Sequence, residues 1–197
     1  MSKPSTFARI RDLNRRQLTA FNAMLLERML PNYNLYAELT EEGDASILRK
    51  ALDVIWQQVY DAKTKINLEL RQEKIEEQIP VASESDSIGL YAAVDAGMAI
   101  IATLAIMDTP ADEANKEVTY PSLLSQGTVE RLLIMNGEVE HSKAALEHPH
   151  MQWEIETQNE FLDEVEKITK FDSSICRTLQ TFALAEGVSN LGIEIEL

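Results

Sequence analysis

The chain has 197 residues, of which 45% are hydrophobic and 26% are charged, and its formal net charge at pH 7 is −15. These ordinary globular values exclude disordered and fibrous classes, and the length suits one domain with a sizeable core. The negative charge repels phosphate backbones and anionic lipid surfaces, so we expect neither a nucleic acid nor a membrane as a partner.

The positive charge is concentrated at the start of the chain. Residues 1–30 hold six basic and two acidic residues, so the remainder carries a net charge of −19. We interpret the early arginines as a surface that complements the acidic remainder. The single cysteine, Cys176, has no internal disulfide partner, and no basic and apolar signal sequence opens the chain. We therefore expect a cytoplasmic protein with a single all-helical domain over residues 1–197.

Hydrophobic residues recur with the 3.6-residue period of a helix along nearly the whole chain. Pro31 is expected to stop or kink the first long helix, and the last segment is predicted as one long helix or two abutting ones. The final residues, NLGIEIEL, alternate and indicate a short extended tail. In chain order, the pattern predicts helices over residues 14–30, 32–39, 45–61, 64–79, 88–108, 122–136 and 150–186.

A single carboxylate, Asp95, interrupts the apolar run GLYAAVDAGMAIIATLAIMD of residues 89–108. The run is long enough to cross a membrane, but an aspartate near its middle costs about 2.5–3.5 kcal/mol there and the flanks are acidic. A helix that is apolar on all sides is typical of the centre of a bundle. The predicted fold is therefore all-α, a bundle of about six to eight helices around a central apolar helix over 88–108.

Buried in such a helix, Asp95 needs a polar partner. An ionised carboxylate without one would raise its pKa and take up a proton. We expect a basic or amide group from another helix, and Arg28 is the first candidate because it projects into the apolar arc of the first long helix. A polar pair that fixes helix register is favoured over a catalytic role.

A group of acidic residues and histidines lies within residues 138–150. Glu138 and His141 have the Glu-x-x-His spacing of di-iron helical bundles, but those sites need two such motifs and two further glutamates. Gly137 and Pro149 instead indicate a helix end and an exposed loop, so Glu138 and His141 are only weak metal candidates and no cofactor is expected. The acidic run from Glu154 to Glu166 is interpreted as a solvated helix face.

Six short motifs lie in register over nearly the whole chain: ERMLPNY (27–33), ALDVIW (51–56), KIN (65–67), EKIEEQIP (73–80), GLYAAVDA (89–96) and SNLGI (189–193). Together they resemble the YjaG-like family of bacterial proteins (domain of unknown function 416). The resemblance implies an all-helical cytoplasmic protein of one domain, with no established activity, cofactor or catalytic residue. Together with the helix patterns, the motifs define a candidate polar pocket or buried network of Arg28, Tyr33, Lys65, Asn67 and Asp95.

The sequence leaves three functions open. The leading hypothesis is a non-catalytic cytoplasmic interaction or scaffold protein that self-associates or binds a protein partner. The alternative is a small-molecule-binding protein or hydrolase with a polar pocket near Asp95, and a weaker one is a carboxylate and histidine metal site. The first two differ in whether the candidate side chains line a solvent-reachable cavity or are sealed and mutually satisfied.

Overall fold

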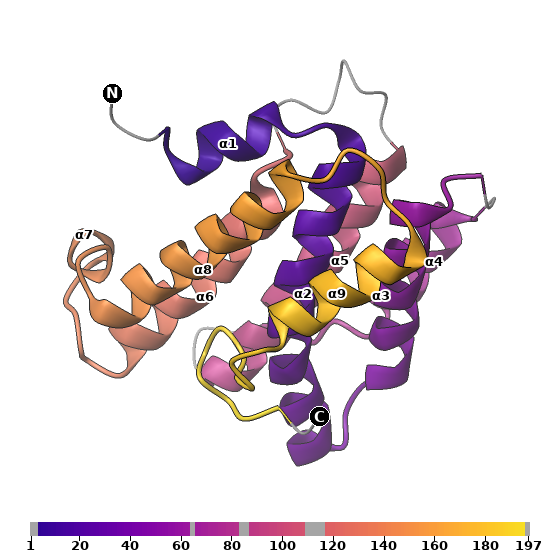
Figure 1. Ribbon diagram of the computed structural model, residues 1–197. Helices are drawn as coiled ribbons and strands as arrows, with labels where there is room; N and C mark the ends of the chain where they lie inside the picture. The colour runs from indigo at the N-terminus through magenta and orange to yellow at the C-terminus, as the bar shows by residue number, and fades with distance from the viewer. Residues whose placement is uncertain (1–3, 64–65, 83–86, 109–116, 196–197) are drawn as a thin grey trace.

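The computed structural model describes residues 4–63, 66–82, 87–108 and 117–195, which form helices joined by short connections. Figure 1 shows α2 running through the middle of the molecule, with α6 and α8 on one side and α3 and α4 on the other. These described residues contain nine helices: α1 (Thr6–Asp12), α2 (Arg15–Thr40), α3 (Ala45–Tyr60), α4 (Leu68–Glu76), α5 (Ile88–Asp108), α6 (Tyr120–Met135), α7 (Ser142–Ala145), α8 (Pro149–Glu166) and α9 (Ser173–Ala183).

The predicted all-α bundle is confirmed, and the first long helix is longer than expected. Asn14 caps α2 through a reciprocal bond with Gln17, and the helix continues through Pro31 to Thr40. The expected stop before Pro31 is therefore wrong, and the predicted helix over 32–39 is part of α2. The proline removes one backbone donor, but α2 is packed against α3, α5, α6, α8 and α9, which hold it helical.

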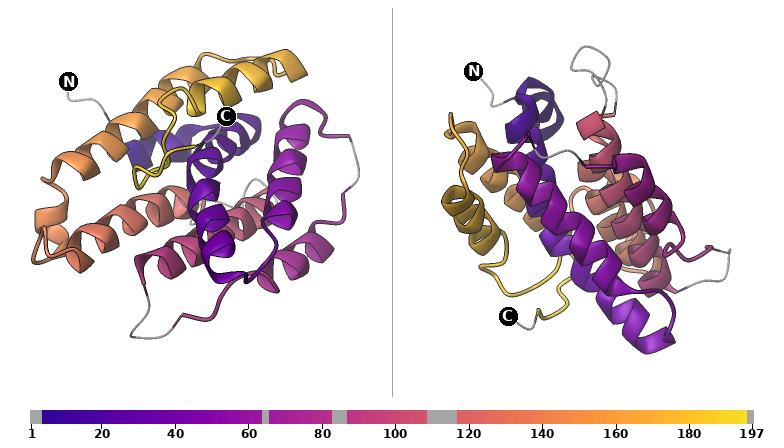
Figure 2. Two further views of the ribbon diagram at one scale, coloured as in Figure 1. Left: turned by 90° about the horizontal axis from the view of Figure 1, so that it is seen from below. Right: turned by 90° about the vertical axis from the view of Figure 1, so that its right-hand side faces the viewer.

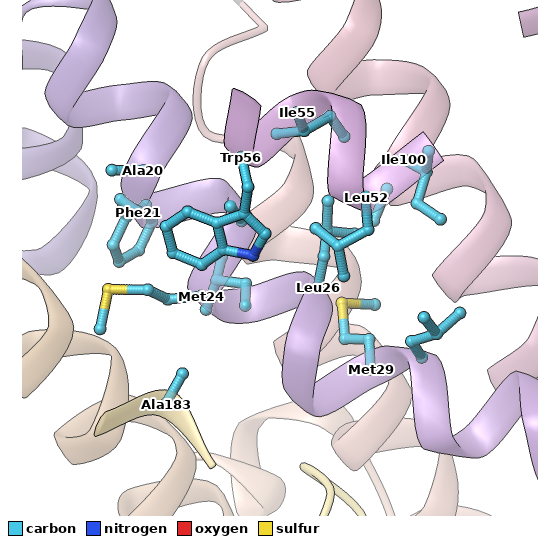
Figure 3. Packing of buried hydrophobic residues seen from close by; sticks show 14 of the residues in the cluster. Ala20, Phe21, Met24, Leu26, Met29, Leu52, Ile55, Trp56, Ile100 and Ala183 are labelled. Atoms are coloured by element: carbon cyan, nitrogen blue, oxygen red, sulfur yellow. The ribbon is translucent and has the colours of Figure 1, made fainter. Parts of the chain in front are cut away.

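The core lies where α2 meets α3 and α5. Figure 3 shows the Trp56 ring of α3 beside Phe21 and Met24 of α2, with Leu52 and Met29 packed next to them. All five side chains are buried. The buried apolar side chains of α3 thus face α2, and burial of each large side chain stabilises the fold by roughly 1.5–3 kcal/mol.

The apolar helix α5 is only partly enclosed. One face packs against α2, α3, α4 and α6, and Gly97 lets Ile79, in the segment that follows α4, come close to the helix. Among the described helices, α5 is the one long and apolar enough to cross a membrane, but 56% of its apolar window is buried inside the protein, as in core helices of soluble proteins. The other face is half-buried, so α2 rather than α5 is the most enclosed helix.

The last third of the chain forms two helices and a tail. Residues 167–172 separate α8 from α9. Of the two predicted alternatives, two helices are therefore correct and one long helix is wrong. Asp172 caps α9, and the tail turns back on itself through a single bridge between Val188 and Glu194. Figure 2 shows this tail folding back beside α2, where it meets the polar groups described below.

Two short helices were not expected from the sequence. The first, α1, is tied to α8 by Arg9, whose guanidinium pairs with Asp163 at 2.6 Å and Glu166 at 2.8 Å. This pairing agrees with the interpretation that the basic start of the chain complements its acidic remainder. The second, α7, is capped by His141, whose Nδ1 accepts a hydrogen bond from the backbone N–H of Ala144.

Candidate functional site

Asp95 lies in the interface between α5 and α6, where its side chain is 8% exposed. Its Oδ2 accepts a hydrogen bond from Thr128 Oγ1 at 2.9 Å, and Arg131 Nη1 lies 3.5 Å away. Burial raises the pKa of Asp95, while the Thr128 hydrogen bond and the Arg131 charge lower it in part. The expected polar neighbour on another helix is thus present on α6, but the prediction that Arg28 is this neighbour is wrong.

Arg28 instead forms a buried ion pair with Glu154 of α8. The distance from Arg28 Nη1 to Glu154 Oε2 is 2.6 Å, and the two side chains are 2% and 0% exposed. The guanidinium also stacks on the Trp153 ring, 4.5 Å from its centroid. The prediction that the acidic run of α8 is a solvated face is therefore wrong for Glu154.

The buried pair belongs to a network that joins three helices to the tail. Ser125 of α6 donates its Oγ–H to Glu154 Oε1 at 2.6 Å, and Asn190 of the tail donates to the same hydroxyl oxygen at 3.1 Å. Asn190 Oδ1 accepts a hydrogen bond from Asn32 Nδ2 at 2.7 Å. The backbone N–H of Asn190 donates to the Arg28 carbonyl. Because every link is buried, the network fixes the relative positions of α2, α6, α8 and the tail.

A second buried carboxylate, Glu27, was not singled out as a site residue. Arg49 of α3 approaches it with two nitrogens at 2.7 and 3.0 Å. Trp56 Nε1 and Gln180 Nε2 donate to Glu27 Oε1 at 2.8 and 2.7 Å. Glu27 therefore locks α3 and α9 onto α2. The sequence feature that could have identified Glu27 is its position among residues of the first long helix that are buried in α2.

Of the remaining predicted site residues, the structure describes Tyr33 and Asn67, and both have partners other than Asp95. Tyr33 is buried and donates a hydrogen bond to the Gln78 carbonyl at 2.8 Å. Its hydroxyl group lies so close to Gly43 that a Cβ there would clash with it. The pKa of Tyr33 is raised by burial. Asn67 is exposed and caps α4. Lys65 lies outside the described residues. The structure therefore brings Asp95 together with Arg131 rather than with Arg28, Tyr33 or Asn67.

The weak metal candidates do not pair with each other. Glu138 Oε2 lies 3.3 Å from His148 Nε2, whereas His141 caps α7. His150 Nε2 contacts the Asn190 carbonyl at 2.8 Å. Within the residues that the structure describes, no group of three histidine, cysteine, aspartate or glutamate side chains is arranged to hold a metal ion.

Comparison with known proteins places the chain in a family. Residues 5–194 match the family described as "Protein of unknown function (DUF416)". An uncharacterised protein of Haemophilus influenzae is 31% identical over 94% of this chain and 95% of its own length. The uncharacterised protein YjaG of Escherichia coli is also 31% identical, over 94% of each chain.

A solved structure agrees with the fold. The crystal structure of a DUF416 family protein from Shewanella baltica superimposes with a TM-score of 0.87 at 30% identity, covering 98% of this chain and 100% of that one. The match extends over the helices that carry both buried networks. The chain therefore belongs to the DUF416 family.

Proposed function

We propose that this chain is a non-catalytic cytoplasmic interaction protein that pairs with a second copy of itself. The contact surface is the outer side of the adjacent helices α5 and α6, here called the α5–α6 face. It consists of Tyr91, Val94, Met98, Ile101 and Ala105 on α5 and Tyr120, Leu123 and Ile134 on α6. The apolar side chains on the outer side of these two packed helices are the observation that carries the proposal.

The side chains of the α5–α6 face are accessible. On α6, Tyr120, Leu123 and Ile134 are exposed, with Leu123 at 46%, and the five α5 residues are half-buried. The two helices meet on this side where Arg131 lies 4.5 Å over the Tyr91 ring. No charged residue occurs in α5 after Asp95 until Asp108. Scattered surface leucines need no explanation, but an apolar face along two helices does.

The size of the face suits a weak contact with a second copy. At 1.5 Å per residue the paired helices present about 22 Å of length, and two neighbouring helices with their side chains are about 20 Å wide. The resulting area, about 450 Å² per copy, is smaller than the roughly 600–1,000 Å² per partner that stable interfaces bury and corresponds to a weak, transient contact. The net charge of −15 repels an anionic membrane, a nucleic acid and a second copy alike at long range, so the short-range apolar contact must supply the attraction between copies.

The buried carboxylates support a structural role for the polar residues. Glu27, Asp95 and Glu154 each accept hydrogen bonds from neighbouring helices. Such pairs hold helices in register. A bundle fixed in this way presents a rigid surface, which lowers the entropic cost of association.

The proposal is tested by the mass of the protein in solution. We expect the wild-type chain to sediment as a dimer and Leu123→Glu to shift it to the monomer, because a charge would be buried in the interface. The matched control is Leu39→Glu, at a position on α2 that is 75% exposed and lies off the α5–α6 face; this variant should remain dimeric. A monomeric wild-type chain, or equal behaviour of the two variants, would overturn the proposal.

A further inference from the structure

A second surface feature lies on the opposite side of α2 from the proposed dimer contact. It is a groove between α3 and α9 with a volume of about 230 Å³, here called the α3–α9 groove. Drug-sized ligands occupy pockets of roughly 300–1,000 Å³, so this groove suits a smaller molecule. Its walls include Asp53, Trp56, Tyr60, Cys176, Arg177 and Gln180.

Hydrogen bonds to a buried carboxylate fix two of the side chains that line the α3–α9 groove. Trp56 and Gln180 both donate hydrogen bonds to the buried carboxylate of Glu27, and Arg49 binds the same carboxylate. The indole ring and the amide are therefore fixed before any ligand arrives. Because Gln180 uses its Nε2 for Glu27, its Oε1 is available as an acceptor at the groove.

The two walls carry opposite charges. Asp53 of α3 is exposed, and Arg49 contacts its Oδ1. Arg177 of α9 is also exposed and has no ionic partner among the described residues, although the chain has 33 acidic and 18 basic residues. A free guanidinium in such an acidic protein is suited to an external carboxylate, because it offers a planar pair of donors.

Between these charges the groove is aromatic and apolar. Tyr60 supplies an exposed ring and Trp56 a largely buried one, and rings bind apolar side chains and cations on their faces. Burial raises the pKa of Cys176 to about 11, so its thiol stays protonated at neutral pH and acts as an apolar wall rather than as a nucleophile. These groups support reversible binding of a ligand rather than a covalent reaction with it.

We infer that the α3–α9 groove binds a small zwitterion, an amino acid or a close analogue of one. The ligand carboxylate pairs with Arg177, its ammonium group meets Asp53 and the Gln180 oxygen, and its side chain packs on Trp56 and Tyr60. This binding is independent of self-association, because the groove and the α5–α6 face share no residue.

The test uses Trp56 as the reporter. Trp153 is the other tryptophan of the chain, so Trp153→Phe isolates the Trp56 fluorescence while keeping a ring over Arg28. We expect at least one of the standard amino acids to change this fluorescence saturably at millimolar concentration. Calorimetric titration of the wild-type chain with the same amino acid gives a second measurement that does not depend on the variant.

Three comparisons then locate the bound molecule. The amide of the best amino acid, which lacks the carboxylate, and its N-acetyl form, which lacks the ammonium group, should each bind about tenfold more weakly. Arg177→Gln should weaken binding by a similar factor, whereas the control Arg11→Gln, at an exposed position on α1, should not. No response to any amino acid, unchanged affinity in Arg177→Gln, or equal binding of the amide would overturn the inference.

Discussion

Asp95 shows how the environment of one residue sets its charge. The carboxylate is removed from water at the α5–α6 interface, and burial raises its pKa above the ordinary value of 3.8. The Thr128 hydroxyl and the Arg131 guanidinium favour the ionised form and offset part of this effect. Such a residue makes the stability of the fold depend on pH.

The sign of that dependence follows from the direction of the pKa shift. Between pH 3.8 and the raised pKa, folded Asp95 keeps a proton that the unfolded chain has released. Its contribution to stability is therefore fully present below pH 3.8 and is lost as the pH rises through the folded pKa. We expect the free energy of unfolding of wild type, relative to Asp95→Asn, to fall across this interval in urea titrations. A difference that is constant or rises with pH would contradict the shift.

The sequence identified Asp95 as a residue that needs a polar neighbour, but it did not identify that neighbour. A helical wheel gives the face on which a side chain lies and not the helix that covers it. Arg28 and Asp95 both point into the bundle, yet Arg28 meets α8 and Asp95 meets α6. The choice depends on how the helices pack, which local patterns do not encode.

At the scale of elements, helix boundaries followed from residues that act locally. Asn14, Asp44 and Asn67 each cap the helix that follows, through a side-chain oxygen. Pro31 misled the prediction, because packing on many sides keeps a helix intact where an isolated peptide would break. Tertiary contacts therefore decide the length of α2.

The close approach of Ile79, which follows α4, to α5 depends on the absence of a side chain at Gly97. A Cβ at Gly97 would lie 2.6 Å from Ile79 Cγ1 and 2.9 Å from its Cδ1. We expect Gly97→Ala to lower the free energy of unfolding by about 1–3 kcal/mol, because Ile79 must move.

Gly89 provides a matched control in the first turn of the same helix. The nearest atom to a Cβ there is Ser87 Oγ at 3.7 Å, an ordinary contact distance. Gly89→Ala should be neutral or stabilise the helix by up to about 1 kcal/mol. Chemical denaturation measures the free energy of unfolding of both variants. Equal changes would mean that the close contact between Gly97 and Ile79 does not limit packing.

At the scale of the whole molecule, polar contacts join distant parts of the chain. The Arg28–Glu154 hydrogen bond connects residues 126 positions apart, and the Asn32–Asn190 bond spans 158. Glu154 was predicted to be exposed because exposed acids surround it in the sequence. A signal existed nonetheless, since positions 154, 158, 161 and 165 have the helical spacing of one face, and all four are buried.

Removing one partner of this pair should destabilise the whole fold. Glu154→Gln leaves the Arg28 charge buried without a carboxylate, and we expect a loss of about 3–5 kcal/mol in the free energy of unfolding. Glu156→Gln, at an exposed position on the same helix, should stay within about 0.5 kcal/mol of wild type. Denaturant unfolding measures both.

A double variant separates the charge effect from general damage. Adding Arg28→Met to Glu154→Gln removes the unpaired charge, so the two substitutions should couple favourably by about 0.5–3 kcal/mol. Strictly additive losses would show that the ion pair makes no net contribution of its own.

The late position of Glu154 and Asn190 matters during synthesis. A ribosome adds 5–20 residues per second, so roughly 6–25 s pass between the emergence of Arg28 and that of the glutamate 126 positions later. Throughout this interval the nascent α2 carries a cation and an amide whose partners do not yet exist. These contacts cannot all form until Asn190 has been synthesised, and a premature stop before this residue would release a product that lacks the partner of Asn32.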